Sequence, residues 1–274
     1  MRLFVAGVRK LLRRPATFVT FGLLVGLLGL IILAVSATAN QLDDDGDGRA
    51  ALLLVTFPVA YTFIVSFILG LGGLFAVIFA AAIAGSEWTW GTLKSAVARG
   101  ESRARYQLLS FAAIALMLGI GLVVAFGIGI LLAIVGANIA GVSTAGLDDS
   151  TTLGTLPDIL GRGWLAIAEE GALGFAIATL ARSQLAGIGA GIAFFFGEQF
   201  ASIFLPDIIK YMPFNAAGAI VNAAGGAPGG GGGGGGGPVT TPLEPNVALL
   251  VVIAWLVGSL AVATIFTERA EISG

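Results

Sequence analysis

The sequence predicts an all-α membrane protein with six transmembrane helices, because of its composition and the distribution of its charges. Of the 274 residues, 57% are apolar and 11% are charged, and the mean hydropathy is +0.98. Soluble domains carry about a quarter charged residues. Here the charges fall in a few clusters, separated by apolar stretches of about 20 residues or more, the length that crosses a bilayer core. This composition excludes an ordinary soluble protein.

Residues 1–14 predict an amphipathic helix that lies along an anionic membrane surface, ahead of the first span. Its apolar face would hold Phe4, Val8, Leu11 and Leu12, and its basic face Arg2, Arg9 and Arg13. Pro15 marks the corner into the span. A basic start and an apolar run are also typical of a signal peptide, but this run exceeds the usual length of about 7–15 residues, and further runs follow it. We therefore interpret it as a retained helix.

Six apolar runs account for the predicted spans. Because lipid offers the backbone no hydrogen-bond partners, each run is expected to be a helix. The runs cover residues 16–38, 52–85, 107–137, 163–181, 183–205 and 247–266. They leave no room for an independent soluble domain, so residues 1–274 are interpreted as one transmembrane domain.

The basic residues predict the orientation. The positive-inside rule places loops rich in Lys and Arg in the cytoplasm. Of the 14 Lys and Arg residues, 11 fall on one side of an alternating path: Arg2, Arg9, Lys10, Arg13, Arg14, Lys94, Arg99, Arg103, Arg105, Arg182 and Arg269. The opposite loops are acidic. Both termini are therefore expected to be cytoplasmic.

Two of the predicted external segments have unusual compositions. Residues 225–238 are almost pure glycine, which predicts a flexible external linker without a site. Residues 43–48 match the opening of a calcium-binding loop, but Leu54 stands at the twelfth position, where bidentate coordination requires Glu. A solvated acidic turn is the preferred interpretation, with external calcium as the alternative. Residues 206–222 mix polar and apolar side chains and are expected to form short interfacial helices.

The residue types present exclude most enzyme chemistry. The chain has no cysteine and no histidine, which removes thiol nucleophiles, thiolate metal sites and imidazole catalysis. None of its lysines follows a glycine, so it lacks a G-x-x-x-x-G-K-[ST] phosphate loop and cannot be its own ATPase. The glycine-rich run 187–191 lies inside a predicted span, where it favours close helix packing over a dinucleotide turn. We expect no catalytic residue, metal ligand, bound cofactor or nucleic-acid partner.

The segment between the second and third spans carries the most informative pattern. Residues 87–100 predict a short helix of about 12 residues that ends at Gly100. Its apolar residues are Trp88, Trp90, Leu93 and Val97, and its basic residues, with the one that follows it, are Lys94, Arg99 and Arg103. Such a helix lies on the membrane or docks on a cytosolic partner. The plainer alternative is an ordinary basic loop that satisfies the positive-inside rule.

This segment resembles the intracellular segment of the type 2 ABC exporter permeases. That family has a Glu after the second span, then Gly-Thr-Leu, a basic residue and a Ser-Arg pair before the third span. The matching residues here are Glu87, Gly91, Thr92, Leu93, Arg99, Ser102 and Arg103. The six spans, cytoplasmic termini and basic amphipathic start are also similar to the family. Two departures are Gly100, where many members have proline, and Ser110, where a lysine often stands.

The resemblance implies a transmembrane permease subunit of an ATP-driven exporter in a bacterial plasma membrane. In that family the segment is a coupling helix that docks into a separate cytosolic ATPase, which binds ATP and Mg²⁺. The resemblance places Glu87, Gly91, Thr92, Leu93, Arg99 and Arg103 at that contact. It also implies a dimer, with a second copy or with another permease, surrounded by membrane lipid. The sequence does not identify the substrate.

Three acidic residues fall inside predicted spans. Glu169 and Glu170 lie in the fourth span and Glu198 in the fifth, and these spans form a hairpin that turns at residues 182–183. At 1.5 Å per residue, Glu170 and Glu198 both come out about 20 Å from the turn, so they could face each other. Intramembrane acids are costly, which makes them candidates for a substrate pathway. Alternatively, they reach the outer interface or pair with Arg162 and only stabilise the bundle.

Two rival functions remain open at the level of sequence. An ion- or proton-coupled secondary transporter would use Glu169, Glu170 and Glu198 and need no ATPase. Such transporters commonly have two similar halves, and no internal repeat is evident here. A structural anchor that recruits a cytosolic partner without moving a substrate is the other alternative.

Overall fold

A computed structural model describes residues 2–39, 51–222 and 243–270. The predicted calcium-like run 43–48 and the predicted glycine-rich linker 225–238 lie outside the described residues.

The described part of the chain consists of helices and their connections. The helices are α1 (Arg2–Leu12), α2 (Pro15–Thr38), the 3₁₀ helix η2 (Leu53–Val55), α4 (Val59–Thr89), α5 (Thr92–Ala98), α6 (Arg103–Ala140), α7 (Ser150–Ala181), α8 (Gln184–Phe204), α9 (Pro206–Ile209), α10 (Pro213–Asn222) and α11 (Pro245–Arg269). Six of them, α2, α4, α6, α7, α8 and α11, are long and apolar enough to cross a membrane. The predicted set of six spans is confirmed to that extent, and it indicates a multi-pass membrane protein.

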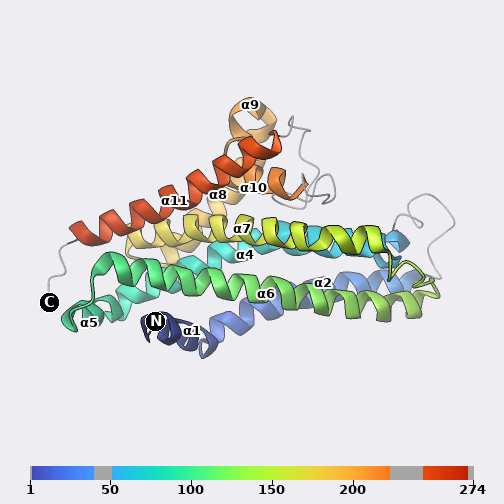
Figure 1. The fold of residues 1–274 in the computed structure, drawn as a ribbon, viewed down its shortest axis with the longest axis horizontal. Helices are drawn as coiled ribbons and strands as arrows, with labels where there is room; N and C mark the ends of the chain where they lie inside the picture. Colours follow the sequence, from blue (N-terminus) through green and yellow to red (C-terminus); the bar gives the residue numbers. More distant parts are fainter. Residues whose placement is uncertain (1, 40–50, 223–242, 271–274) are drawn as a thin grey trace.

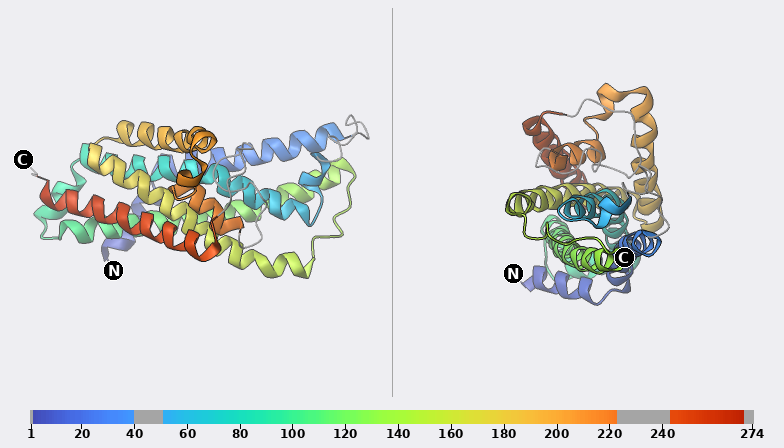
Figure 2. Two further views of the ribbon diagram at one scale, coloured as in Figure 1. Left: turned by 90° about the horizontal axis from the view of Figure 1, so that it is seen from above. Right: turned by 90° about the vertical axis from the view of Figure 1, so that its right-hand side faces the viewer.

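The long helices run side by side, with α4 and α7 at the centre (Figure 1). In the most apolar 18-residue stretch of α7, 72% of the residues are buried, compared with 17% in α11. The outer helices therefore expose apolar side chains, as helices that face lipid do. Helix α1 lies across the bundle, set back from the end that carries α5 (Figures 1 and 2).

Two predicted span boundaries are wrong. Helix α4 begins at Val59 rather than at residue 52, and the residues before it form η2. Helix α7 begins at Ser150 rather than at residue 163, because Asp149 caps it: the Asp149 Oδ2 accepts a hydrogen bond from the Thr152 amide at 2.9 Å. The polar residues of this added stretch lie on the helix surface, so low hydropathy concealed a real helix.

The predicted helix after the second span is shorter than expected. Helix α5 has seven residues, while Glu87 and Trp88 belong to the last turn of α4. Gly91 separates the two helices in the left-handed conformation, with φ of 63°. Residues with a Cβ disfavour that conformation, so the glycine sets the reversal of the chain. Gly100 ends α5 with φ of 87°.

The segment 206–222 forms short helices, as predicted. Helix α10 is almost entirely buried, and it packs against α7, α8 and α11. Small side chains such as Ala216, Ala217 and Gly218 allow this close packing. The short α9 leads into it.

Candidate functional site

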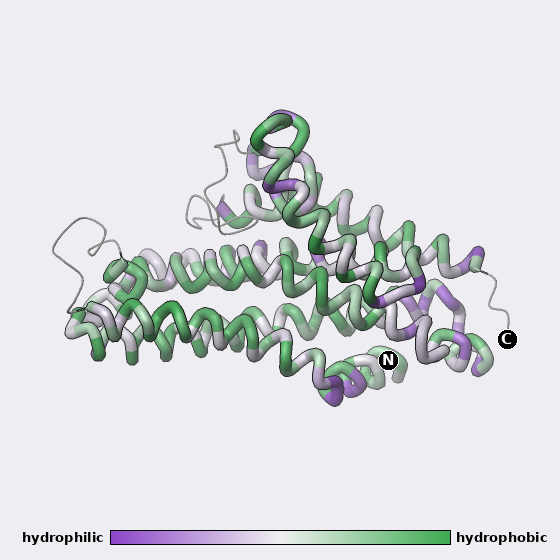
Figure 3. Tube along the Cα trace, turned by 180° about the vertical axis from the view of Figure 1, so that it is seen from behind, coloured by the Kyte–Doolittle hydropathy of each residue, from purple (hydrophilic) through white to green (hydrophobic). Residues whose placement is uncertain are grey.

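Polar and aromatic side chains gather at the α5 end of the bundle. The end of α4, all of α5 and the start of α6 meet there with α1 and the end of α11. Hydrophilic residues concentrate at this end and on α1, whereas the long helices are mainly hydrophobic (Figure 3).

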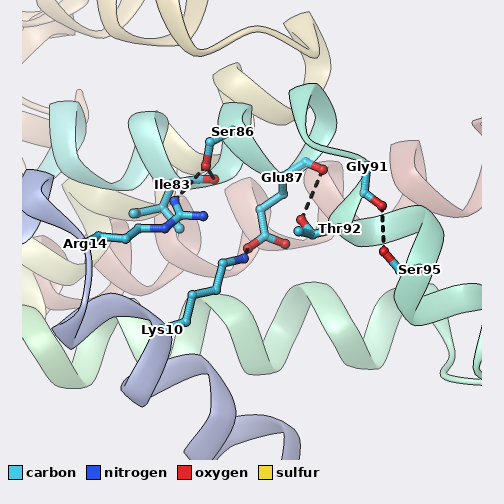
Figure 4. Close-up of polar contacts among 8 residues, drawn as sticks. All are labelled: Lys10, Arg14, Ile83, Ser86, Glu87, Gly91, Thr92 and Ser95. Atoms are coloured by element: carbon cyan, nitrogen blue, oxygen red, sulfur yellow. Dashed lines mark hydrogen bonds and ion pairs between the residues drawn. The ribbon is translucent and has the colours of Figure 1, made fainter.

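An ion pair joins α1 to α4. The Lys10 Nζ donates to the Glu87 Oε1 at 2.5 Å, and only 7% of the Glu87 side chain is exposed (Figure 4). Next to it, Arg14 Nη1 donates to Ser86 Oγ at 2.7 Å, and Ser86 donates to the Ile83 carbonyl. Burial lowers the pKa of Arg14, an effect that the nearby Glu87 opposes. Two consecutive α4 residues thus hold the N-terminal segment in place.

Aromatic rings bring further elements to the same end. The Arg14 guanidinium lies over the Trp90 ring at 4.9 Å from its centroid. Arg182, in the turn between α7 and α8, lies over the rings of Trp88 and Phe266 at 5.1 and 5.3 Å. These distances fit cation–π contacts. The tip of the α7–α8 hairpin and the end of α11 therefore contact the last turn of α4.

The Gly-Thr-Leu part of the motif has a local structural role. Thr92 Oγ1 donates to the Glu87 carbonyl at 3.2 Å, and Ser95 Oγ donates to the Gly91 carbonyl at 3.0 Å (Figure 4). Leu93 is 2% exposed and packs inward. These contacts fix the direction in which α5 leaves α4.

The two arginines of the motif have different surroundings. Arg103 Nη1 donates to the carbonyls of Thr267, Glu268 and Ala270 at 3.3, 3.1 and 2.7 Å, and so caps the end of α11. Arg99 is exposed on α5. Of the residues predicted to contact an ATPase, Glu87, Leu93 and Arg103 are thus engaged inside the chain.

The exposed surface around α5 combines basic, polar and aromatic side chains. Trp90, which precedes the helix, is 66% exposed, and Lys94, Ser95, Ala98 and Arg99 are exposed as well. This surface is available to a partner, whereas the Glu87 carboxylate is not.

Of the three intramembrane acids, Glu198 has a complete set of partners. Its Oε1 accepts from the Phe214 amide at 3.3 Å, and its Oε2 accepts from the Asn215 amide and side chain at 3.2 and 2.9 Å. These donors belong to the first turn of α10, where amides lack partners within the helix and favour a negative charge. Glu198 therefore anchors α10 against α8.

Glu169 and Glu170 are buried without such partners. Both oxygens of Glu169 and Oε2 of Glu170 lack a hydrogen bond. Glu170 lies directly against Gly73 of α4, where a Cβ would overlap the carboxyl group. Glu169 and Glu170 each lie within electrostatic range of Glu198. The alternative pairing with Arg162 is wrong, because Arg162 binds Asp158 at 3.1 Å.

Several residues of these sites escaped sequence reasoning. Lys10, Arg14 and Asn215 gave no signal beyond general polarity, because their partners lie far away in the chain or on another helix. A Pro at the start of residues 213–222 could have indicated a helix N-terminus that needs an acceptor.

No protein-family model matches the chain, and no curated protein matches it.

Proposed function

We propose that the chain is the transmembrane permease subunit of an ATP-driven exporter of the type 2 ABC class. It works with a separate cytosolic ATPase, which binds ATP and Mg²⁺. The observation that supports this function is the exposed surface of Trp90, Ala98 and Arg99, held at one end of the bundle by α4. The Gly-Thr-Leu and Ser-Arg motif surrounds this surface in the sequence.

The distribution of basic residues supports a cytoplasmic position for the α5 end of the bundle. Most of the basic residues belong to α1, α5, the start of α6 and the end of α11, and the positive-inside rule favours the cytoplasm for them. In this orientation α1 lies along the inner surface of a bacterial plasma membrane. Helix α5 projects beyond it, and both termini are cytoplasmic.

The contacts at this end supply a route for mechanical coupling. A force on α5 acts on α4 through the short Gly91 turn and on α6 through the turn at Gly100. Helix α4 is joined to α1 by the Lys10–Glu87 pair, and α6 is joined to α11 by Arg103. Helix α4 packs along the central helix α7. ATP-driven closure of a bound ATPase would thus tilt the spans of a permease dimer and alternate the access of a substrate. In this function the transmembrane chain catalyses no reaction itself.

The test is co-purification of a cytosolic ATPase with the tagged full chain in mild detergent. Ala98→Arg places a bulky charge on the exposed face of α5 without removing a contact inside the chain. Ala145→Arg is the matched control, because Ala145 is also exposed, in the loop between α6 and α7. We expect the wild type and the control to retain the ATPase and Ala98→Arg to lose it. Absence of an ATPase from an intact wild-type oligomer would overturn the proposal.

Glu169 favours a second candidate, an ion- or proton-coupled transporter. A fully buried carboxyl group with two unpartnered oxygens is costly unless it exchanges a proton or a cation. Proteoliposomes that contain the chain alone distinguish the two functions. Ion flux without ATP that disappears in Glu169→Gln would support the secondary transporter, and absence of flux would leave the ATP-driven function.

A further inference from the structure

A cavity lies where α1 meets the ends of α4, α5 and α6. It has a volume of about 320 Å³. Its polar lining consists of Lys10, Glu87, Thr92, Ser95, Arg99 and Tyr106. Its apolar lining includes Leu3, Ala6, Ile83 and Leu109. A ligand with one polar end and one apolar end matches this lining.

The polarity of the lining follows the long axis of the bundle. Helix α5 contributes only polar residues, and α1 contributes mainly apolar ones. On α4, Ile83 lies one turn farther from α5 than Glu87, and on α6, Leu109 lies about one turn farther from it than Tyr106, so polar residues line the end nearer α5. An amphiphile at a membrane interface has the same gradient from water to hydrocarbon.

The charges of the lining favour an anionic group. Lys10 is engaged by Glu87, whereas the Arg99 guanidinium forms no hydrogen bond or ion pair with the described residues. With Lys10 and Arg99 against Glu87, the lining has one excess positive charge. A guanidinium offers planar donors that match the geometry of a phosphate.

The Glu87 carboxylate is already engaged within the chain. Its Oε1 accepts from Lys10, the Tyr106 hydroxyl interacts with it, and its Oε2 is covered by protein atoms. Arg99 is therefore the charged group of the lining that a ligand can bind.

We propose that this cavity binds the headgroup of one anionic glycerophospholipid, of which phosphatidylglycerol is a simple example. Arg99 binds the phosphate, and the diacylglycerol end of the lipid lies over Leu3 and Leu109. The cavity holds the volume of about ten water molecules, which suits the headgroup, while the acyl chains continue into the membrane. The lipid would join α1 to α5 and thereby stabilise the proposed ATPase-binding surface. Its binding to the chain does not depend on the ATPase.

Lipid titration of the delipidated full chain in detergent, followed by native mass spectrometry, tests the site. The probes are phosphatidylglycerol, phosphatidylcholine, whose headgroup has no net charge, and soluble glycerol phosphate. Arg99→Gln removes the charge, and Ser110→Phe fills the cavity from α6. Arg105→Gln is the matched control, because this exposed arginine lies near the site but does not line it.

We expect one phosphatidylglycerol per chain. It should bind at least about tenfold more tightly than phosphatidylcholine, because a charge-assisted hydrogen bond changes affinity by about that factor. Arg99→Gln should weaken binding by about tenfold, Ser110→Phe should abolish it, and Arg105→Gln should leave it unchanged. If Ser110→Phe does not fold, Ala6→Phe fills the same cavity from α1.

Three results would overturn the inference. Equal affinity for the two lipids would exclude a role for the charge of the headgroup. Equal losses in Arg99→Gln and Arg105→Gln would assign binding to the general positive surface. Glycerol phosphate that competes as strongly as intact lipid would make the ligand a free phosphate compound. ATPase co-purification is measured separately, so failure of the lipid site is distinguishable from failure of the proposed function.

Discussion

At the scale of single residues, the buried glutamates of the described part of the chain fall into two groups. Glu87 and Glu198 are buried with partners, whereas Glu169 lacks them. A buried charge whose partner is removed costs more than a solvated one, because the remaining charge is left in a medium of low polarity. The effect of replacing a buried acid on stability therefore depends on its hydrogen-bond or ion-pair partners and not on burial alone.

The Lys10–Glu87 pair should behave as a unit in a charge exchange. Lys10→Glu and Glu87→Lys each place two like charges next to each other at the joint of α1 and α4. We expect each single variant to lose about 1–3 kcal/mol of stability and the double variant to recover most of it. Thermal unfolding in detergent measures this. If the double variant loses as much stability as the two single variants together, Lys10 and Glu87 are not energetically coupled.

Two isosteric substitutions should separate a structural acid from an unpartnered one. Glu198→Gln removes the charge that accepts three hydrogen bonds from α10, so we expect a loss of about 1–3 kcal/mol. Glu169→Gln loses no hydrogen bond and should unfold at the wild-type temperature or above it. Both are compared by thermal unfolding in the same detergent. A Glu169→Gln variant that is less stable than Glu198→Gln would contradict the structural role of Glu198.

At the scale of elements, glycines determine how closely α8 approaches the bundle. A Cβ on Gly187 would overlap Ala178 of α7, and one on Gly191 would overlap Val77 of α4, whereas one on Gly189 would meet open space. The prediction that the run 187–191 serves helix packing is thus confirmed. Its first and last glycines lie one turn apart on the inner face of α8.

Leucine substitutions along this run should show the same pattern. Gly187→Leu and Gly191→Leu force α8 away from its neighbours and should lower stability by about 1–3 kcal/mol. Gly189→Leu is the matched control and should have no measurable effect, since its side chain points away from the bundle. Thermal unfolding of the three detergent-purified variants checks this. A similar loss in all three would point to helix propensity or lipid contacts instead.

At the scale of the whole molecule, the proposed orientation places the two ends of α6 on opposite sides of the membrane. Helix α5 precedes α6, and the loop with Ala145 follows it. The chain contains no cysteine, so single cysteines at exposed positions report sidedness without interference.

Cysteine labelling of intact cells should therefore distinguish the two ends. A membrane-impermeant thiol reagent should label Ala145→Cys in intact cells and Ala98→Cys only after lysis, because we place the α5 end in the cytoplasm. Both alanines are exposed, so accessibility within the protein is matched. Labelling of Ala98→Cys in intact cells would contradict the cytoplasmic position of α5.

The sequence by itself determined the helical class, the six apolar helices and the turn between α7 and α8. Apolar length is a local property, and a backbone in lipid must satisfy its hydrogen bonds within each helix, so these features need no knowledge of neighbours. Where polar residues cover a helix surface, as in the first turns of α7, hydropathy alone missed the helix.

Only the tertiary structure decided which polar residues meet. Lys10 and Glu87 are 77 positions apart, and Glu198 finds its donors in a helix that folds back beside α8. The short α5, the buried α10 and the amphipathic cavity likewise depend on which faces the helices turn to one another. Those faces are set by side-chain packing between distant segments, which a one-dimensional pattern of hydropathy and charge does not encode.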